Sequence, residues 1–145
     1  MAKVRGFEIV ADVADKEQVI LPKRSTEKSA GYDLHALRDI VVEPGQVGLV
    51  ETGLTAYMQA DEWLGIYIRS GTSFKYQVML ANGVGVVDSD YYGNEIKIMI
   101  RNIGDRPLSF QRGDRVAQAI FQKYLLVDAD EASGVRSGGF GSTGV

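Results

Sequence analysis

Alternating side chains are the feature that most constrains what this chain can fold into. In residues 95–102 (EIKIMIRN) isoleucine occupies positions 96, 98 and 100, and Lys97, Met99 and Arg101 follow them in turn. A period of two places successive side chains on opposite faces of a β-strand. Ile96, Ile98 and Ile100 therefore share one face, and the segment is predicted to be a strand.

Short strands between turns are predicted over most of the chain. Residues 43–46 (EPGQ) place proline and then glycine at the central positions, the order that a type II turn prefers. The flanking residues 39–42 and 47–58 are expected to be paired strands. Residues 70–77 are compatible with one short helical turn. Residues 115–127 fit a helical face as well as a strand, and we favour a strand because they directly follow a turn. One all-β domain, a sandwich or a barrel, is expected.

Composition excludes several classes of function. The 145-residue chain has 16 basic and 19 acidic residues, a net charge of −3, which argues against a nucleic-acid polymer as the main ligand. It has no cysteine and one histidine, His35, so disulfides, thiolate metal sites and histidine-based metal sites are not expected. No apolar run approaches a membrane span, and residues 1–18 lack an apolar signal core. We therefore expect a cytoplasmic protein that does not bind membranes.

Two internal stretches have residues suited to binding a small ligand. In residues 68–75 (IRSGTSFK), Arg69, Ser70 and Gly71 leave a strand together, and they form either a phosphate cradle or a solvated turn. Residues 82–98 are predicted to be a β-hairpin with Asp88 and Tyr91 near its bend, alongside Asp90. Exposed main chain in such a hairpin pairs with the edge of a flat ligand, while a carboxylate holds water as a general base. The alternative for this stretch is a polar turn.

Three further stretches carry unusual residue choices. Residues 29–36 (SAGYDLHA) place a glycine and an aspartate at a strand entrance, and residues 112–121 (RGDRVAQAIF) place Gln118 between two alanines. Asp114 and Arg115 are interpreted as a structural turn or ion pair. The C-terminal GVRSGGFGSTGV combines Arg136 and Phe140 with five glycines. The chain has neither a Walker-type loop nor a G-x-S-x-G elbow.

In order, AGYDLHA, RSGTSFK, GVGVVDSDYYG, RGDRVAQAIF and RSGGFGSTG resemble the five motifs of the trimeric dUTPases (dUTP diphosphatases). The resemblance implies a jelly-roll-like distorted β-barrel with at most one short helix over residues 1–128. A flexible C-terminal arm, residues 129–145, is expected to close over an active site of a neighbouring subunit in a homotrimer. The implied reaction is hydrolysis of dUTP to dUMP and pyrophosphate by attack of water on the α-phosphorus. This reaction keeps uracil out of DNA and supplies dUMP for dTMP synthesis.

The resemblance also implies roles for individual residues. The residues implied for catalysis are Asp88 and Gln118. Those implied for phosphate binding are Arg69, Ser70, Gly71, Gln118, Arg136, Ser142 and Thr143. Those implied for binding uracil and deoxyribose are Asn82, Gly85, Val87, Tyr91, Ile96, Phe140 and Gly141. Mg²⁺ is expected as cofactor, held by substrate phosphates and water with no direct protein ligand.

Two positions depart from the family pattern, and two other functions remain open at this point. Arg136 lies one residue closer to Phe140 than is usual, and Tyr92 stands where the family often has arginine. One alternative is a dCTP deaminase or a bifunctional relative, which would need a glutamate to activate water at the base. The other is a protein that binds dUTP for regulation without turnover.

Overall fold

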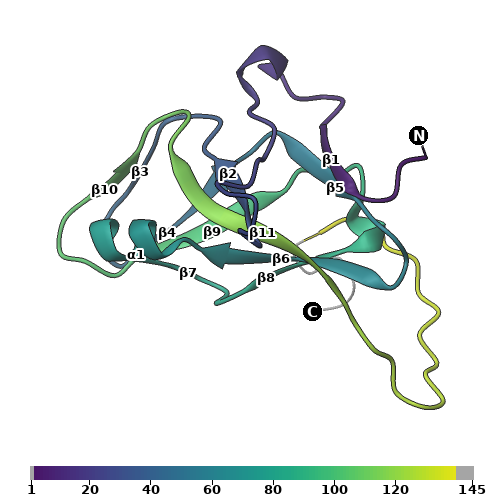
Figure 1. Ribbon diagram of the computed structural model, residues 1–145. Helices are drawn as coiled ribbons and strands as arrows, with labels where there is room; N and C mark the ends of the chain where they lie inside the picture. Colours follow the sequence, from purple (N-terminus) through teal and green to yellow (C-terminus); the bar gives the residue numbers. More distant parts are fainter. Residues whose placement is uncertain (1, 140–145) are drawn as a thin grey trace.

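The computed structural model describes residues 2–139, and their fold is built mainly of β-strands (Figure 1). This part of the chain has eleven strands, one α-helix and two short 3-10 turns. The strands are β1 (Gly6–Ile9), β2 (Tyr32–His35), β3 (Ile40–Val42), β4 (Val47–Glu51), β5 (Leu54–Tyr57), β6 (Glu62–Ile68), β7 (Val78–Leu80), β8 (Gly85–Asp88), β9 (Lys97–Asn102), β10 (Leu108–Phe110) and β11 (Arg115–Lys123). The helix is α1 (Ser70–Tyr76), and the 3-10 turns are η1 (Lys16–Gln18) and η2 (Ser89–Tyr91). The expected all-β class with at most one short helix is confirmed.

The strands are divided among four antiparallel sheets, so the described residues do not form one closed barrel. The largest sheet has the order β2-β11-β6-β8, and the second has the order β4-β9-β7. Two strand pairs, β1-β5 and β3-β10, complete the set. Within the described part of the chain no helix is long and apolar enough to cross a membrane.

Side chains from one face of each of the two larger sheets form the buried core. Ile98 and Ile100 of β9 are 1% and 0% exposed, as the alternation predicts, while Arg101 of the same strand is exposed. Leu64 of β6 and Leu34 of β2 are fully buried in the same cluster. β11 is a strand, as predicted. Removal of these side chains from water is the main stabilising contribution to such a fold.

The turn at residues 43–46 forms as predicted, but the strands on either side of it do not pair with each other. Gly45 has φ +77°, and the Gln46 N–H donates to the Glu43 carbonyl at 3.0 Å. β3 pairs with β10, and β4 pairs with β9. A Cβ on Gly48 would lie 2.6 Å from Cγ2 of Val42, so β3 packs against β4 through side chains. The turn therefore carries the chain from one sheet to another.

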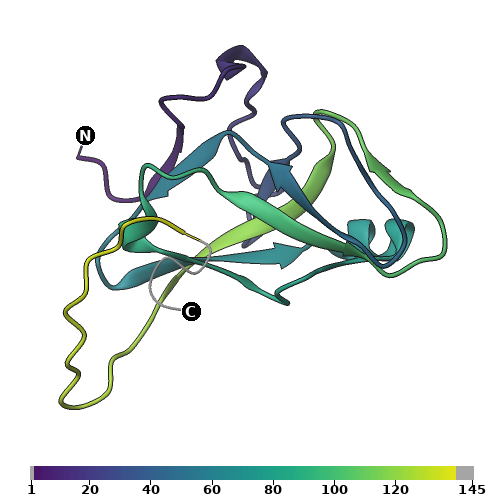
Figure 2. The same cartoon turned by 180° about the vertical axis from the view of Figure 1, so that it is seen from behind.

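The C-terminal segment leaves the sheets after β11. Residues 124–139 contain no helix or strand. Figures 1 and 2 show this segment, in yellow, extending away from the strands and then returning to the region of η2. The division of the chain between residues 128 and 129 stays a prediction.

Replacement of Asn102 tests how the sheets are joined. Its side chain is 1% exposed and bonds three backbone groups: Nδ2 donates to the carbonyls of Val42 (2.9 Å) and Arg106 (2.6 Å), and Oδ1 accepts from the Gly104 N–H (2.9 Å). Asn102→Ala leaves these groups unpaired in the interior, so we expect it to lower the free energy of unfolding by about 2–4 kcal/mol. Denaturant unfolding at fixed protein concentration measures this.

The matched control is Asn94→Ala, which removes an exposed asparagine with a single bond to the Tyr91 carbonyl. This control is expected to cost less than about 1 kcal/mol. Equal unfolding midpoints for the two variants would show that the Asn102 bonds do not hold the sheets together.

Candidate active site

β8 lies at the edge of the largest sheet and pairs with β6 on one side only. In this register Asp88 lies opposite Trp63 at the start of β6, and Gly85 lies opposite Ile66. A Cβ on Gly85 would lie 2.8 Å from Cβ of Ile66, closer than side chains allow. Glycine is therefore required for β8 to approach β6, and this approach sets the position of Asp88.

The prediction that residues 82–98 form a β-hairpin is wrong, and the two predicted arms instead border a cavity. Its second arm, β9, pairs with β4 and β7 instead of β8. The two arms belong to different sheets, and a cavity of about 220 Å³ lies between them. No strand in residues 2–139 pairs with the outer edge of β8. Its peptide groups are therefore available to a flat ligand, which is the property that the hairpin was expected to provide.

We name this space the β8 cavity. Predicted site residues that line it are Asn82, Gly85, Val87, Asp88, Tyr91, Ile96 and Arg136. Lining residues that sequence reasoning missed are Ile66, Leu80, Val86, Lys97, Ile98, Met99 and Gly139. The alternation of β9 had already placed Ile98 on the same face as Ile96, but the contribution of β6 and β7 depends on sheet pairing. An apolar cavity with a few polar groups is typical of a small-molecule site.

Tyr91 forms a fixed wall of the β8 cavity. Its hydroxyl donates to the Glu95 carbonyl at 2.7 Å. Burial, and then the nearby charge of Glu95, raises the pKa of Tyr91, so the phenol stays neutral and remains a donor. A Cβ on Gly139 would lie 2.5 Å from Cε1 of Tyr91, so only glycine lets the C-terminal segment approach this ring so closely.

Arg136 connects the C-terminal segment to two carboxylates beside the cavity. Its Nη2 donates to Oδ2 of Asp88 at 2.5 Å, and its Nε donates to Oδ1 of Asp90 at 2.7 Å. The Arg136 side chain is 16% exposed, whereas those of Asp88 and Asp90 are 50% and 59% exposed. The guanidinium of Arg136 is therefore more buried than either carboxylate that it contacts. Asp90 lies in the predicted bend but was not predicted as a site residue.

Arg69 and Gln118, two other predicted phosphate-binding residues, lie at a different place together with Asp33, Thr72 and Arg115. We name these five residues the Arg69 cluster. Nε of Arg69 donates to Oδ1 of Asp33 at 3.1 Å. Nε2 of Gln118 donates to the Ile68 carbonyl at 3.4 Å, and a Cβ on Gly31 would lie 2.3 Å from its Oε1. Ser70 and Gly71, both exposed, begin α1 directly after Arg69.

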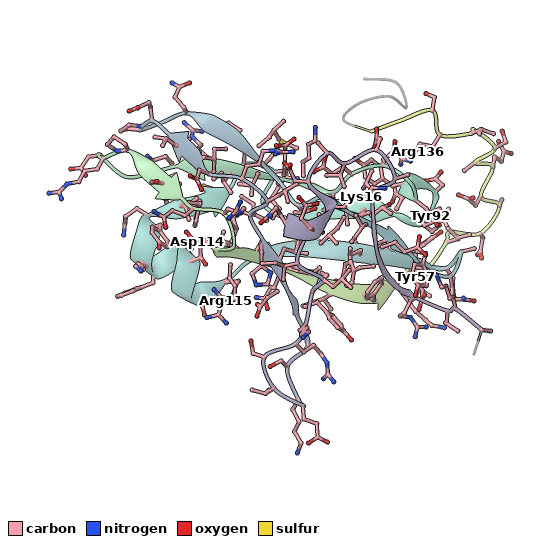
Figure 3. The ribbon with its side chains drawn as sticks, turned by 90° about the horizontal axis from the view of Figure 1, so that it is seen from above. Lys16, Tyr57, Tyr92, Asp114, Arg115 and Arg136 are labelled. Atoms are coloured by element: carbon pink, nitrogen blue, oxygen red, sulfur yellow. The ribbon has the colours of Figure 1, made fainter. Side chains whose placement is uncertain are left out.

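Asp88 and the Arg69 cluster lie at opposite ends of β6, although the β8 cavity itself extends along the strand to Ile66. Asp88 is opposite Trp63, and Arg69 comes six residues after Trp63. An extended strand advances about 3.3 Å per residue, so Asp88 and Arg69 are roughly 20 Å apart along β6. Figure 3 shows Arg136 and Arg115 on opposite sides of the molecule. One chain therefore does not bring Gln118 and Asp88, the two predicted catalytic residues, together.

Four predicted site residues, Phe140, Gly141, Ser142 and Thr143, lie outside the described residues, and their roles stay predictions. Within residues 2–139, no three histidine, cysteine, aspartate or glutamate side chains come together as metal ligands.

Comparisons with known proteins agree with the motifs and the geometry. The family model described as dUTPase matches residues 17–144. The deoxyuridine 5'-triphosphate nucleotidohydrolase of Lactococcus lactis is 44% identical over 98% of this chain and 99% of its own length. That of Helicobacter pylori J99 is 40% identical over 87% of this chain and 90% of its own. The crystal structure of the Streptococcus mutans dUTPase has a TM-score of 0.79 at 40% identity, covering 86% of this chain and 99% of its own. The chain belongs to the dUTPase family.

Proposed function

We propose that this protein hydrolyses dUTP to dUMP and pyrophosphate, which keeps uracil out of DNA and supplies dUMP for dTMP synthesis. The observation that carries the proposal is a cavity along an unpaired strand edge, with the carboxylate of Asp88 at the end of that strand. The names of the L. lactis and H. pylori relatives, both deoxyuridine 5'-triphosphate nucleotidohydrolases, support the choice of substrate.

Uracil is recognised by fixed main-chain groups. We propose that the base lies in the β8 cavity against Val87 and Ile96, with its polar edge toward Asn82 and the peptide groups of β8 from Gly85 onward. Fixed donors and acceptors that match uracil would meet cytosine with reversed polarity, leaving buried groups unpaired. A thymine methyl group would clash with the wall. Tyr91, held by its bond to Glu95, packs against deoxyribose and excludes a 2′-hydroxyl.

Asp88 acts as the general base in this mechanism. Its carboxylate orients a water molecule and accepts a proton from it as the water oxygen bonds to the α-phosphorus, and the bond to the bridging oxygen of pyrophosphate breaks. Arg136 bonds Asp88 and Asp90 in the structure, and guanidinium binds phosphate with the same fork geometry that it uses for carboxylate. We propose that Arg136 exchanges these carboxylates for substrate phosphates, which frees Asp88 for water.

We further propose a homotrimer in which each active site is shared between subunits. The separation of roughly 20 Å between Asp88 and Arg69 along β6 supports this arrangement, since a phosphate group beside Asp88 is too far from Arg69 of the same chain to contact both. Arg69, Ser70, Gly71 and Gln118 would then bind phosphates that belong to a neighbouring copy's nucleotide. Residues 129–145 would form an arm that closes over a site, with Phe140 and Gly141 at the base and Ser142 and Thr143 at the phosphates.

Dependence on a divalent metal is a property of the family. We propose Mg²⁺ for this protein, bound mainly by phosphate oxygens and water, because Mg²⁺ usually keeps several waters and binds through substrate phosphates. When bound, the ion would reduce the charge of the triphosphate. A cytoplasmic location stays a prediction from the sequence.

Replacement of Asp88 tests its role as base. Asp88→Asn keeps shape and hydrogen bonding but loses the proton acceptor, so we expect kcat for dUTP to fall by about 10²–10⁴-fold while the Kd for dUMP stays within about twofold. Pyrophosphate release and calorimetric dUMP binding measure the two quantities.

Asp90→Asn is the matched control, because it removes the same charge from the same turn and from the same arginine. Its kcat is expected to fall by less than about tenfold, since Asp90 holds Arg136 and does not orient the attacking water in the proposed mechanism. If Asp88→Asn and Asp90→Asn reduced kcat equally, the general-base role of Asp88 would be wrong.

A substrate panel tests the proposed reaction itself. The purified protein with Mg²⁺ should release pyrophosphate from dUTP at least about 10²-fold faster, by kcat/KM, than from dTTP, dCTP or UTP, because each competitor leaves a buried group unpaired or clashes. Ammonia should not form from dCTP. Comparable rates for dUTP and dTTP would contradict the proposed recognition of uracil in the β8 cavity. Ammonia release would favour a deaminase.

A further inference from the structure

The Arg69 cluster contains one more cation than its carboxylate neutralises. Asp33 is 13% exposed, and it faces Arg69 Nε at 3.1 Å and Arg115 Nη1 at 3.7 Å. Its Oδ2 also accepts from the Ser25 hydroxyl at 3.0 Å, which brings no charge. Two guanidinium groups therefore share a single carboxylate, which leaves one unit of positive charge at the cluster.

Arg115 reaches this position because β11 is irregular at its first residues. Arg115 lies opposite His35 of β2, but the next register pair joins Ala117 to Leu34, so Val116 is an extra residue in a bulge. Val116 and Ala117 are both fully buried, which breaks the alternation of the strand. Bulges commonly redirect a side chain next to a functional site. Here the bulge lets Arg115 point outward beside Arg69.

The two arginines are also connected through Thr72. Nη1 of Arg69 donates to the Thr72 hydroxyl, and that hydroxyl donates to the carbonyl of Arg115, each at 3.3 Å. Thr72 is 3% exposed, so this link is shielded from solvent. The Arg115 side chain is 51% exposed, whereas that of Arg69 is 24% exposed. Arg115 therefore keeps N–H groups that are open to a ligand.

His35 does not change this balance of charge. Burial is the main cause that lowers the pKa of His35, and the cations of Arg115 and Arg69 lower it further, against Asp33, which raises it. The imidazole is therefore neutral near pH 7, and the excess charge of the cluster comes from arginine alone.

We propose that Arg115 is a further phosphate-binding residue, which binds the pyrophosphate portion of the nucleotide together with Arg69. This inference rests on the proposed function and extends its phosphate site. A triphosphate carries several negative charges, and paired guanidinium forks match its outer oxygens better than one does. The pyrophosphate portion is the part in question because the base is assigned to the β8 cavity and the α-phosphorus to the water held by Asp88.

The test compares Arg115→Ala and Arg115→Gln with the wild-type protein in the presence of Mg²⁺. We expect the KM for dUTP and the inhibition constant of pyrophosphate each to rise about tenfold, the loss of one charge-assisted contact. The Kd for dUMP, which lacks the outer phosphates, should change by less than about twofold. Arg115→Gln keeps the length of the side chain, so it provides a folded variant if Arg115→Ala is unstable.

Arg106→Ala is the control for loss of one positive charge, because Arg106 is exposed and no ion pair of its side chain occurs among residues 2–139. It should leave all three constants unchanged. Equal weakening of dUMP and pyrophosphate in the Arg115 variants, or constants like those of Arg106→Ala, would overturn the inference and leave Arg115 as a structural ion-pair partner. A wild-type protein that releases no pyrophosphate from dUTP would instead refute the proposed function, while pyrophosphate binding would still report on Arg115.

Discussion

The length of β6 is the constraint on which the rest of the structure depends. This strand runs through the largest sheet with Asp88 beside its first residues and Arg69 just beyond its last. A hydrogen-bonded central strand cannot fold back on itself, so the carboxylate and the arginine cluster are held apart. The chain thus places Asp88 and the Arg69 cluster at opposite ends of one strand, and the shared site proposed above would join them between copies. A closed symmetric oligomer is the simplest arrangement that joins unlike surfaces of identical chains.

At each of these two places a local feature of the backbone positions the side chains. At one end, Gly85 allows β8 to pair closely with β6 and leaves the other edge of β8 open to the cavity. At the other end, the bulge in β11 turns Arg115 outward beside Arg69. Rigid placement of the groups that bind charge is what reduces the cost of reorganisation during phosphoryl transfer. The C-terminal segment adds Arg136, whose guanidinium bonds carboxylates and phosphates with the same geometry.

Local patterns predicted the elements well, because they depend on neighbouring residues. The isoleucines at 96, 98 and 100 identified β9, and the order of Pro44 and Gly45 identified the turn before β4. Pairing was predicted poorly, because the partner of a strand is chosen by burial across the whole core. β8 and β9 were expected to pair as neighbours in sequence, and they instead border a cavity. Asp114 and Arg115 were interpreted as a structural turn or ion pair, and Arg115 does form an ion pair with Asp33. The bulge that positions Arg115 was not predicted, because a bulge leaves no mark in the local pattern.

The most direct test of the shared site is complementation between two inactive variants. Asp88→Asn and Arg69→Ala would be mixed in equal amounts and allowed to exchange subunits. If each site takes its carboxylate from one copy and its arginine from another, random mixing of a closed oligomer restores about a quarter of the sites, and dUTP turnover should return to a similar fraction of the wild-type rate. Mixtures no more active than either parent would show that one chain supplies both groups, which would contradict a site shared between subunits.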